Sequence, residues 1–454
     1  MIAQLAFALV LATGIFFFAR RVREIRRNIQ LGHSEDRTDR KADRWKTMAL
    51  VALGQSKMVK RPIAGFLHFL IYLGFVIINI EVLEIVIDGL TGQHRIFAQL
   101  GLGGLYDVLI GSFEILAAGV LLACVIFLIR RNILPIARFR SRELKGWASS
   151  DANIILVVEV LLMFAFLSMN AADSILQTHL AVALTNGAEV SEALSHYIEA
   201  GSFPVSSLLV PMYDGLSDAG LMGLERFMWW FHIVGILAFL VYVPYSKHFH
   251  IIMAFPNTWY SKLEPKGQLN NLGAVTNEVK LMLDPSADPF AAPAADAAPV
   301  KFGAKDVNDL SWKQLFDAYT CTECGRCSSV CPANQTGKLL SPRKIMMDTR
   351  DRVEEVGRNL GPDGQPQADG KSLLRDYISE EELWACTTCN ACVEACPVNI
   401  DPVSIILDLR RHLIMEESKS PESITSMFNN IENNGAPWAF PAADRGKWSE
   451  EMNA

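Results

Sequence analysis

Residues 321–332 read Cys-Thr-Glu-Cys-Gly-Arg-Cys-Ser-Ser-Val-Cys-Pro, and residues 386–397 read Cys-Thr-Thr-Cys-Asn-Ala-Cys-Val-Glu-Ala-Cys-Pro. Both stretches have the spacing C-x2-C-x2-C-x3-C-P, in which three thiolates bind one [4Fe–4S] cluster and the fourth reaches a neighbouring cluster. Two copies therefore predict a two-cluster ferredoxin domain. The expected ligands are Cys321, Cys324, Cys327 and Cys396 for the first cluster, and Cys386, Cys389, Cys392 and Cys331 for the second.

Zinc knuckles are the alternative, because they also use C-x2-C pairs. Two complete sets of four cysteines, each followed by proline, favour iron–sulfur clusters. Residues 333–385 separate the two runs and contain predicted helices at 342–355 and 380–384 around a turn-rich segment at 360–370. A compact ferredoxin of β-hairpins has no space for this insertion. We therefore expect a helical ferredoxin domain, similar to that in the iron–sulfur subunits of succinate dehydrogenase and fumarate reductase, completed by a helix at 402–417.

The N-terminal half of the chain is strongly apolar. Half of the 454 residues are hydrophobic, and five segments have about the length and apolarity needed to cross a bilayer. They are residues 2–19, 62–87, 105–129, 153–170 and 227–243, the last continuing as a helix towards residue 252. The first segment has no basic region before it and no small-residue cleavage site after it, so we read it as a retained helix and not as a signal peptide. The fold class expected is an all-α membrane protein.

Basic residues predict the orientation of this bundle, because they stay on the cytoplasmic side. Thirteen lie between residues 20 and 61 and six between residues 130 and 145, whereas residues 88–104 contain only Arg95 and residues 171–225 contain none. The N-terminus is therefore expected outside a bacterial-type inner membrane and the cysteine runs in the reducing cytoplasm, where metal binding is favoured over disulfides. The net charge of −7 and the absence of a long basic run make nucleic acid an unlikely partner.

Histidines within or near the predicted spans are candidate haem ligands, because a histidine in a membrane is costly and usually functional. His68 lies near the cytoplasmic end of the second span, and His232, His248 and His250 lie in the fifth span and its continuation. In a continuous helix, the 18 residues from His232 to His250 make five turns, which places both imidazoles on one face about 27 Å apart. That separation predicts one haem b near each membrane surface.

The segment Val243-Pro-Tyr-Ser-Lys-His-Phe-His250 and the His232–His250 pair resemble the fifth helix of the nitrate reductase gamma subunit family, a five-helix dihaem cytochrome b module. This resemblance implies His250, and not His248, as a ligand, with His68 opposite it. The family's second helix carries another histidine ten residues further on, where this sequence has Ile78. Either His94 or His179 is a candidate to replace it, and otherwise His232 is a haem-free relic or a quinone-site residue. One haem or two therefore remain open.

Two carboxylates near the outer end of the second span, Glu81 and Glu84, are candidate quinone-site residues. Intramembrane acids commonly face a cavity or proton path, and a quinol releases two protons when its electrons leave. Their position at the membrane surface explains them nearly as well. Glu114 and Glu159 are further acids within the third and fourth spans.

The sequence predicts four regions: a transmembrane cytochrome b-like domain (1–255), a linker (256–304) containing an Ala/Pro/Asp tether at 284–299, the ferredoxin domain (305–418) and a tail (419–454). The tail resembles the passage that joins ferredoxin to a Cys-Cys-Gly domain in membrane oxidoreductases of the heterodisulfide-reductase type. No cysteine follows Cys396, so that domain is expected on a separate subunit. Docking candidates are Met427, Phe428, Trp438 and Phe440.

The expected function is electron transfer between the quinone pool and a cytoplasmic redox partner, through haem b and two [4Fe–4S] clusters. The resemblance implies quinone reduction with electrons from a donor such as electron-transferring flavoprotein. One alternative is quinol oxidation feeding a heterodisulfide-reductase-like enzyme, and a second is a passive membrane anchor and electron wire without its own quinone site. A transporter is disfavoured, since the five spans show no paired repeats or broken half-helices.

Overall fold

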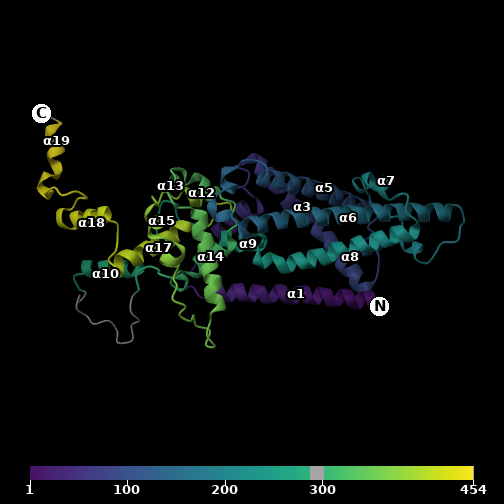
Figure 1. Cartoon of the computed structure of the whole chain (residues 1–454), viewed down its shortest axis with the longest axis horizontal. Helices are drawn as coiled ribbons and strands as arrows, with labels where there is room; N and C mark the ends of the chain where they lie inside the picture. Colours follow the sequence, from purple (N-terminus) through teal and green to yellow (C-terminus); the bar gives the residue numbers. More distant parts are fainter. Residues whose placement is uncertain (287–300, 453–454) are drawn as a thin grey trace.

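The computed structural model describes residues 1–286 and 301–452, and over these ranges its regular elements are helices without β-strands. Five helices are long and apolar enough to cross a membrane. They are α1 (Ile2–Ile29), α3 (Pro62–Thr91), α5 (Gly104–Asn132), α6 (Trp147–Thr185) and α8 (Asp218–Tyr242). They lie along one another in alternating directions, and a second, helical domain caps one end of the bundle (Figure 1). The all-α membrane fold class is confirmed.

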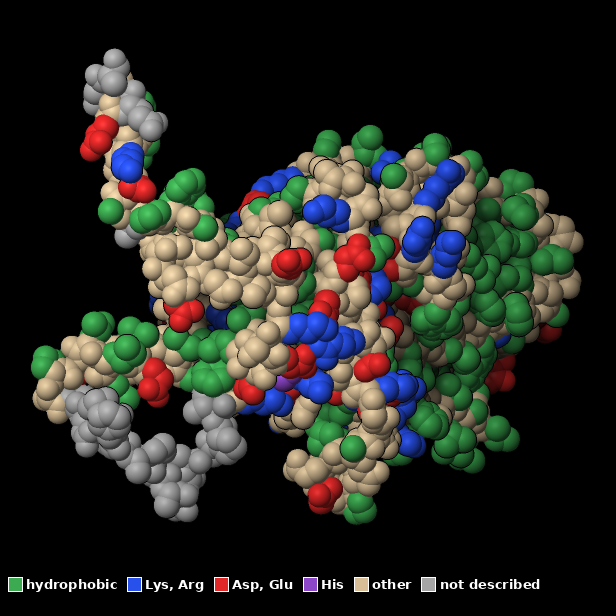
Figure 2. Space-filling model, turned by 60° about the vertical axis from the view of Figure 1, so that its left-hand side comes forward, with side chains coloured by type: hydrophobic (Ala, Val, Ile, Leu, Met, Phe, Trp, Pro, Cys, Tyr) green, Lys and Arg blue, Asp and Glu red, His purple; other side chains and the backbone are tan. Residues whose placement is uncertain are grey.

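Each long helix of the bundle packs against two others. Helix α5 lies between α3 and α6, α8 packs on α6, and α1 packs against α8 and α3. Apolar side chains on the outside of α1, such as Leu5, Leu9 and Phe16, remain exposed. Hydrophobic side chains cover the bundle surface, whereas the charged side chains gather on the C-terminal domain and along the boundary between the two (Figure 2). This distribution is typical of a bundle in lipid beside a domain in water.

Helix α6 is longer than the predicted span at 153–170. Its C-terminal part is held by tertiary packing, because Ile175 and Leu176 are buried with Leu221 of α8. His179 consequently lies within α6, and not beyond it.

The predicted helical continuation of the fifth span to residue 252 is wrong. Helix α8 ends at Tyr242, and Ser246 adopts an extended conformation (φ −114°, ψ 156°) before α9 (His250–Trp259) begins. Pro244 lacks the N–H that a continuing helix needs. The Ser246 hydroxyl accepts a hydrogen bond from the backbone N–H of His248 (3.0 Å) and so caps the next turn. His232 and His250 therefore do not share one continuous helix face.

The C-terminal domain confirms the helices predicted around the cysteine runs. They are α14 (Pro342–Arg358), α15 (Glu380–Trp384) and α17 (Pro402–Met415), joined by α11 (Trp312–Thr320), α12 (Arg326–Val330) and α16 (Ala391–Ala395). Ser311 and Ser379 begin α11 and α15 with reciprocal capping boxes. Of the predicted linker, α9 and α10 (Gly273–Leu283) are helical, whereas residues 287–299 of the tether lie outside the described residues. Helix α18 (Glu422–Asn434) extends away from the domain (Figure 1).

The C-terminal end of α1 fixes the second domain against the bundle. Asn28 Nδ2 donates to the hydroxyl of Tyr319 (3.0 Å), and Arg21 pairs with Glu354 (2.6 Å). Close approach is required at Gly357, where an added Cβ would lie 2.2 Å from Oδ1 of Asn28. The contacts that place the C-terminal domain beneath the membrane helices are therefore supplied by the chain itself.

Candidate functional site

The two cysteine runs fold in the same way. In the first run, Glu323 and Gly325 have positive φ (52° and 70°); in the second, Thr388 and Asn390 occupy the corresponding positions with φ of 53° and 57°. A short helix follows in each, and both fourth cysteines leave their helix in an extended conformation before proline. The α12 and α16 helices pack against each other. This arrangement brings the end of each run to the beginning of the other.

Two cavities lie among the cysteines. The first is lined by Cys321, Cys324, Cys327, Cys392 and Cys396. The second is lined by Cys331, Cys386, Cys389 and Cys392. Cys392 lines both cavities, and each of them combines the first three cysteines of one run with the fourth cysteine of the other, as the C-x2-C-x2-C-x3-C-P spacing requires for two [4Fe–4S] clusters.

The arrangement of thiols disfavours the zinc alternative. Over residues 1–286 and 301–452, no three His, Cys, Asp or Glu side chains converge closely enough to hold a single metal ion. The sulfur atoms instead surround open volumes, which fits a cluster better than one ion with bonds of about 2.3 Å to each sulfur. The remaining cysteine, Cys124, is buried in the core of the bundle as a small apolar side chain.

The two cavities differ in their surroundings. The first faces the membrane bundle, because Arg326 of its lining donates to the backbone carbonyl of Lys57 (2.9 Å) and Lys57 Nζ donates to the carbonyl of Cys396 (3.1 Å). The second includes Cys389, which is exposed. The first cavity is therefore the inner one, and the second opens to the aqueous surface.

Positive charge surrounds the inner cavity. The fully buried Arg343 donates to the carbonyl of Arg138 (3.0 Å), and burial lowers the pKa of the Arg138 guanidinium to about 10. Burial likewise lowers the pKa of Lys57 to about 8. Glu323 offsets part of this charge by pairing with Lys247 and with Arg350 (2.8 Å). Cations of this kind favour the more negative, reduced state of a cluster.

Replacing Lys57 by methionine is expected to lower the midpoint potential of the inner cluster by tens of millivolts, because a cation beside Cys396 is removed. A redox titration followed by electron paramagnetic resonance would measure the shift. Lys60→Met is the matched control, since Lys60 is largely exposed and pairs with Glu394 (2.8 Å). Equal potentials in wild type and Lys57→Met would contradict this electrostatic role.

The histidines predicted at the inner end of the bundle lie together. The imidazole centroids of His68 in α3 and His250 in α9 are 6.4 Å apart. His250 Nδ1 donates to the carbonyl of Lys247 (2.9 Å), which orients the ring, whereas the buried Nδ1 atom of His68 has no hydrogen-bond partner in the described residues. Two metal–nitrogen bonds of about 2 Å each plus the two ring radii give a centroid separation of about 6 Å, so this pair fits an iron between the rings.

His248 also lies beside this pair. Its ring packs edge-on against His250 (5.7 Å between centroids) and against Phe239 (5.3 Å). This position makes it a neighbour of the candidate haem site. The centroid separations do not distinguish His248 from His68 as the partner of His250, so the choice of His68 and His250 as ligands stays a prediction.

The outer histidines are not brought together in the same way. His232 is buried, donates from Nδ1 to the carbonyl of Leu162 (3.0 Å), and packs on Phe166. Ile78 is buried in the apolar core of the bundle. His94 contacts Asp173 (3.4 Å) and Arg226 (3.3 Å) through its two ring nitrogens. No second imidazole pair like that of His68 and His250 is present in the described residues.

The other candidate, His179, lies near the remote end of the bundle, away from the C-terminal domain. Its Nδ1 bonds to Asp218 (2.8 Å), and both side chains are partly exposed. His179 of α6 therefore pairs with an acidic residue in the first turn of α8 at the bundle surface.

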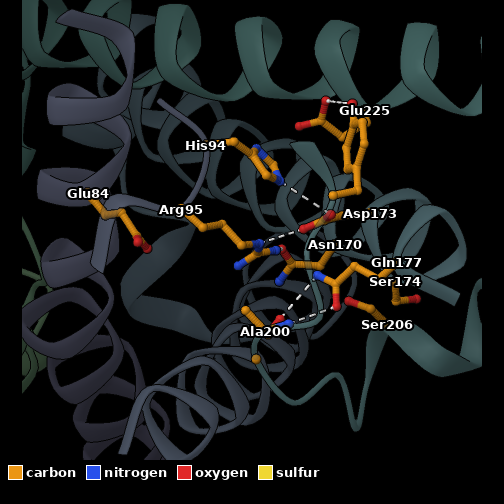
Figure 3. A network of polar contacts seen from close by, with 12 residues as sticks. Glu84, His94, Arg95, Asn170, Asp173, Ser174, Gln177, Ala200, Ser206 and Glu225 are labelled. Carbon is orange, nitrogen blue, oxygen red and sulfur yellow. Dashed lines mark hydrogen bonds and ion pairs between the residues drawn. The ribbon is translucent and has the colours of Figure 1, made fainter. Parts of the chain in front are cut away.

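A buried polar cluster occupies the remote end (Figure 3). Arg95 is at its centre and donates to Asp173 (2.5 Å), Asn170 (3.0 Å) and the Tyr106 hydroxyl (3.2 Å). Glu84, one of the two candidate acids, accepts hydrogen bonds from this hydroxyl (3.1 Å). Arg95, Asp173 and Tyr106 were not singled out from the sequence. The available signal was that Arg95 is the one basic residue of the 88–104 connection and that Asp173 lies in an apolar helix.

Residues 320–400 match the family described as the 4Fe-4S dicluster domain. The chain contains a two-cluster iron–sulfur domain. This match covers both cysteine runs and the insertion between them, and together with the two cavities it supports [4Fe–4S] clusters. Electron transfer is the general chemistry of such clusters.

Curated relatives extend over the membrane half as well. The probable iron-sulfur-binding oxidoreductase FadF of Bacillus subtilis is 29% identical over 98% of this chain and 61% of its own length. The EtfAB:quinone oxidoreductase of Syntrophomonas wolfei is 25% identical over 91% of this chain and 55% of its own. The probable membrane-anchored ferredoxin of Chromohalobacter salexigens is 35% identical over 35% of this chain and 26% of its own. The chain thus spans less than two thirds of these relatives, and no solved structure matches it. Two of these relatives are named as oxidoreductases and the third as a ferredoxin, in agreement with the predicted class of iron–sulfur oxidoreductase.

Proposed function

We propose that this chain is the membrane electron-transfer subunit of an oxidoreductase that links the quinone pool to a cytoplasmic redox partner. The favoured direction is quinone reduction with electrons that originate from an electron-transferring flavoprotein. The Syntrophomonas wolfei relative, an EtfAB:quinone oxidoreductase, supports this choice of flavoprotein donor and quinone acceptor. The N-terminus would lie outside a bacterial-type inner membrane and the dicluster domain in the cytoplasm, in agreement with the distribution of basic residues.

The observation that carries this proposal is the order of the candidate redox sites. Cys389 places the second cavity at the aqueous surface, the first cavity lies deeper, and the His68–His250 pair lies in the adjacent end of the membrane bundle. Arg326 lines the inner cavity and donates to the carbonyl of Lys57 (2.9 Å), in the loop before the helix α3 that carries His68. This order would lead electrons from a partner in solution into the membrane half.

The chain's own residues would fix and tune these sites. The eight cysteines would hold two [4Fe–4S] clusters, and His68 and His250 would hold a haem b. When bound, these groups supply one-electron transfer. Lys247 contributes twice, because its carbonyl orients His250 and its ammonium group pairs with Glu323 beside the inner cavity. His232 is retained as a candidate ligand or quinone-site residue at the outer haem position.

The C-terminal tail is the proposed docking site for a separate Cys-Cys-Gly subunit. Phe428, Trp438 and Phe440 are exposed on α18 and the segment after it. Met427 of α18 is partly buried. Exposed aromatic side chains of this kind are enriched at the centres of protein interfaces.

The proposed function predicts that the purified chain, reduced by an artificial low-potential donor, reduces a lipid-soluble quinone with two electrons per molecule. The rate would be followed by quinone absorbance after anaerobic purification. Clusters that are reduced without any quinone reduction would instead support the passive anchor and electron wire.

A further inference from the structure

The remote end of the bundle contains more buried acid than its cations balance. Arg95 is surrounded by Glu84, Asp88 and Asp173, and its charge also acts on Glu81. The carboxyl of Glu114 also acts on Glu81. One guanidinium does not offset five carboxylates away from water, because an unpaired buried charge is strongly destabilising. Intramembrane acids beyond those needed for pairing call for a functional explanation.

Four of these five acids have structural partners. Glu84 accepts from the Phe97 N–H (2.8 Å) and Asp88 from the Ile96 N–H (3.0 Å), which fixes the turn after α3. Glu114 accepts from the Ser206 N–H (3.0 Å) and so holds the loop before α8. Asp173 pairs with Arg95. Each of these carboxylates explains a piece of local structure.

Glu81 differs from the other four. It is 3% exposed, and its Oε2 atom has no hydrogen-bond partner in the described part of the chain. A buried unpartnered carboxyl destabilises the fold and calls for a functional explanation. It faces charged or titratable groups from each neighbouring element: Glu84 on α3, Arg95 in the following loop, and Tyr106 and Glu114 on α5.

The cluster reaches the surface on the side away from the dicluster domain. From Arg95, Asp173 leads to His94, whose side chain is 16% exposed and contacts Arg226 (Figure 3). Arg95 keeps its proton at all times, so it organises the acids and does not carry protons itself.

We infer that Glu81 is the proton-transfer residue of the quinone reaction and that its protons come from the remote, outer face, by way of the polar cluster that Arg95 organises. This inference rests on the proposed function. Reduction of one quinone takes two electrons from the dicluster side and two protons. Glu81 gives one proton to one quinone oxygen, takes up a second proton from the remote face and gives it to the other oxygen. A further uptake restores the starting state, so two protons leave the remote face for each quinone reduced and the charge of the two electrons is balanced. The structure also separates the two candidate acids, since Glu84 is occupied by its hydrogen bonds.

The test uses the full chain in lipid vesicles that contain a lipid-soluble quinone, a trapped pH-sensitive dye and valinomycin with potassium. Dithionite, which does not cross the bilayer, reduces only molecules whose dicluster domain faces the bulk solution, so their remote end faces the lumen. We expect the lumen to become alkaline by two protons per quinone reduced. Quinone reduction without a change in luminal pH would overturn the inference and leave the proposed function intact. Absence of quinone reduction would overturn both.

Variants locate the proton step. Glu81→Gln is expected to slow quinone reduction by about a hundredfold, in the range typical of general acid–base groups, while the clusters are reduced by dithionite at the wild-type rate. Glu81→Asp should recover part of the quinone rate. Glu159→Gln is the matched control, since Glu159 is an acid of α6 outside the cluster. Wild-type quinone reduction in Glu81→Gln would contradict the assignment of this residue.

Discussion

Cys331→Ser is expected to remove the [4Fe–4S] cluster of the second cavity, whose three other ligands belong to the second cysteine run. The cluster of the inner cavity should stay in place. The reason is the crossed lining of the cavities, in which Cys331 joins Cys386, Cys389 and Cys392. The non-haem iron content should fall from about eight to about four per chain. Iron analysis and electron paramagnetic resonance of the anaerobically purified protein would measure this loss.

Double variants test the crossing itself. Cys331→Ser combined with Cys386→Ser should retain about four irons, because both residues line the same cavity. Cys331→Ser combined with Cys321→Ser should lose nearly all iron, because the two residues line different cavities. The reverse result, with full loss in the Cys331–Cys386 variant, would show that each run binds its own cluster.

His68→Ala and His250→Ala are each expected to abolish haem binding at the inner site while the non-haem iron stays at about eight. Their ring centroids lie 6.4 Å apart, and the two imidazoles would hold the haem together, so that either one alone would not retain it. Pyridine haemochrome analysis of the membrane-extracted protein would give the haem content.

His232→Ala determines the number of haems. Loss of haem in His232→Ala as well as in His68→Ala would support a dihaem arrangement, with one group near each surface. Loss only with His68 would leave a single inner haem, and wild-type protein without haem would reduce the membrane half to an anchor for the dicluster domain. His179→Ala is the matched control, because His179 pairs with Asp218 at the bundle surface.

The sequence predicted the membrane helices well where the signal was local. The spans at 62–87 and 105–129 lie within α3 and α5, because about twenty apolar residues are sufficient to define a crossing. The extension of α6 to Thr185 was missed, since this part depends on packing against α8. The break at Ser246 was also missed. Pro244 did not by itself predict a break, because proline is tolerated within the first turn of a helix.

The candidate site divides in the same way. The cysteine spacing predicted two clusters, and the two cavities and the dicluster match agree with that prediction. The intramembrane acids Glu81 and Glu84 could not be ranked from sequence, because both lie near the same end of one helix. Only the hydrogen bonds of Glu84 to Phe97 and Tyr106 separate them.

The sequence by itself determined the cluster chemistry, the membrane spans and the division into two halves. Each depends on residues close together along the chain, where covalent geometry and side-chain polarity decide the outcome. Tertiary structure alone decided that His68 meets His250, that the dicluster domain docks on α1, and that Glu81 is left unpartnered beside Arg95. These features join segments far apart in sequence, and their geometry follows from how the helices pack and which polar groups find partners when water is excluded.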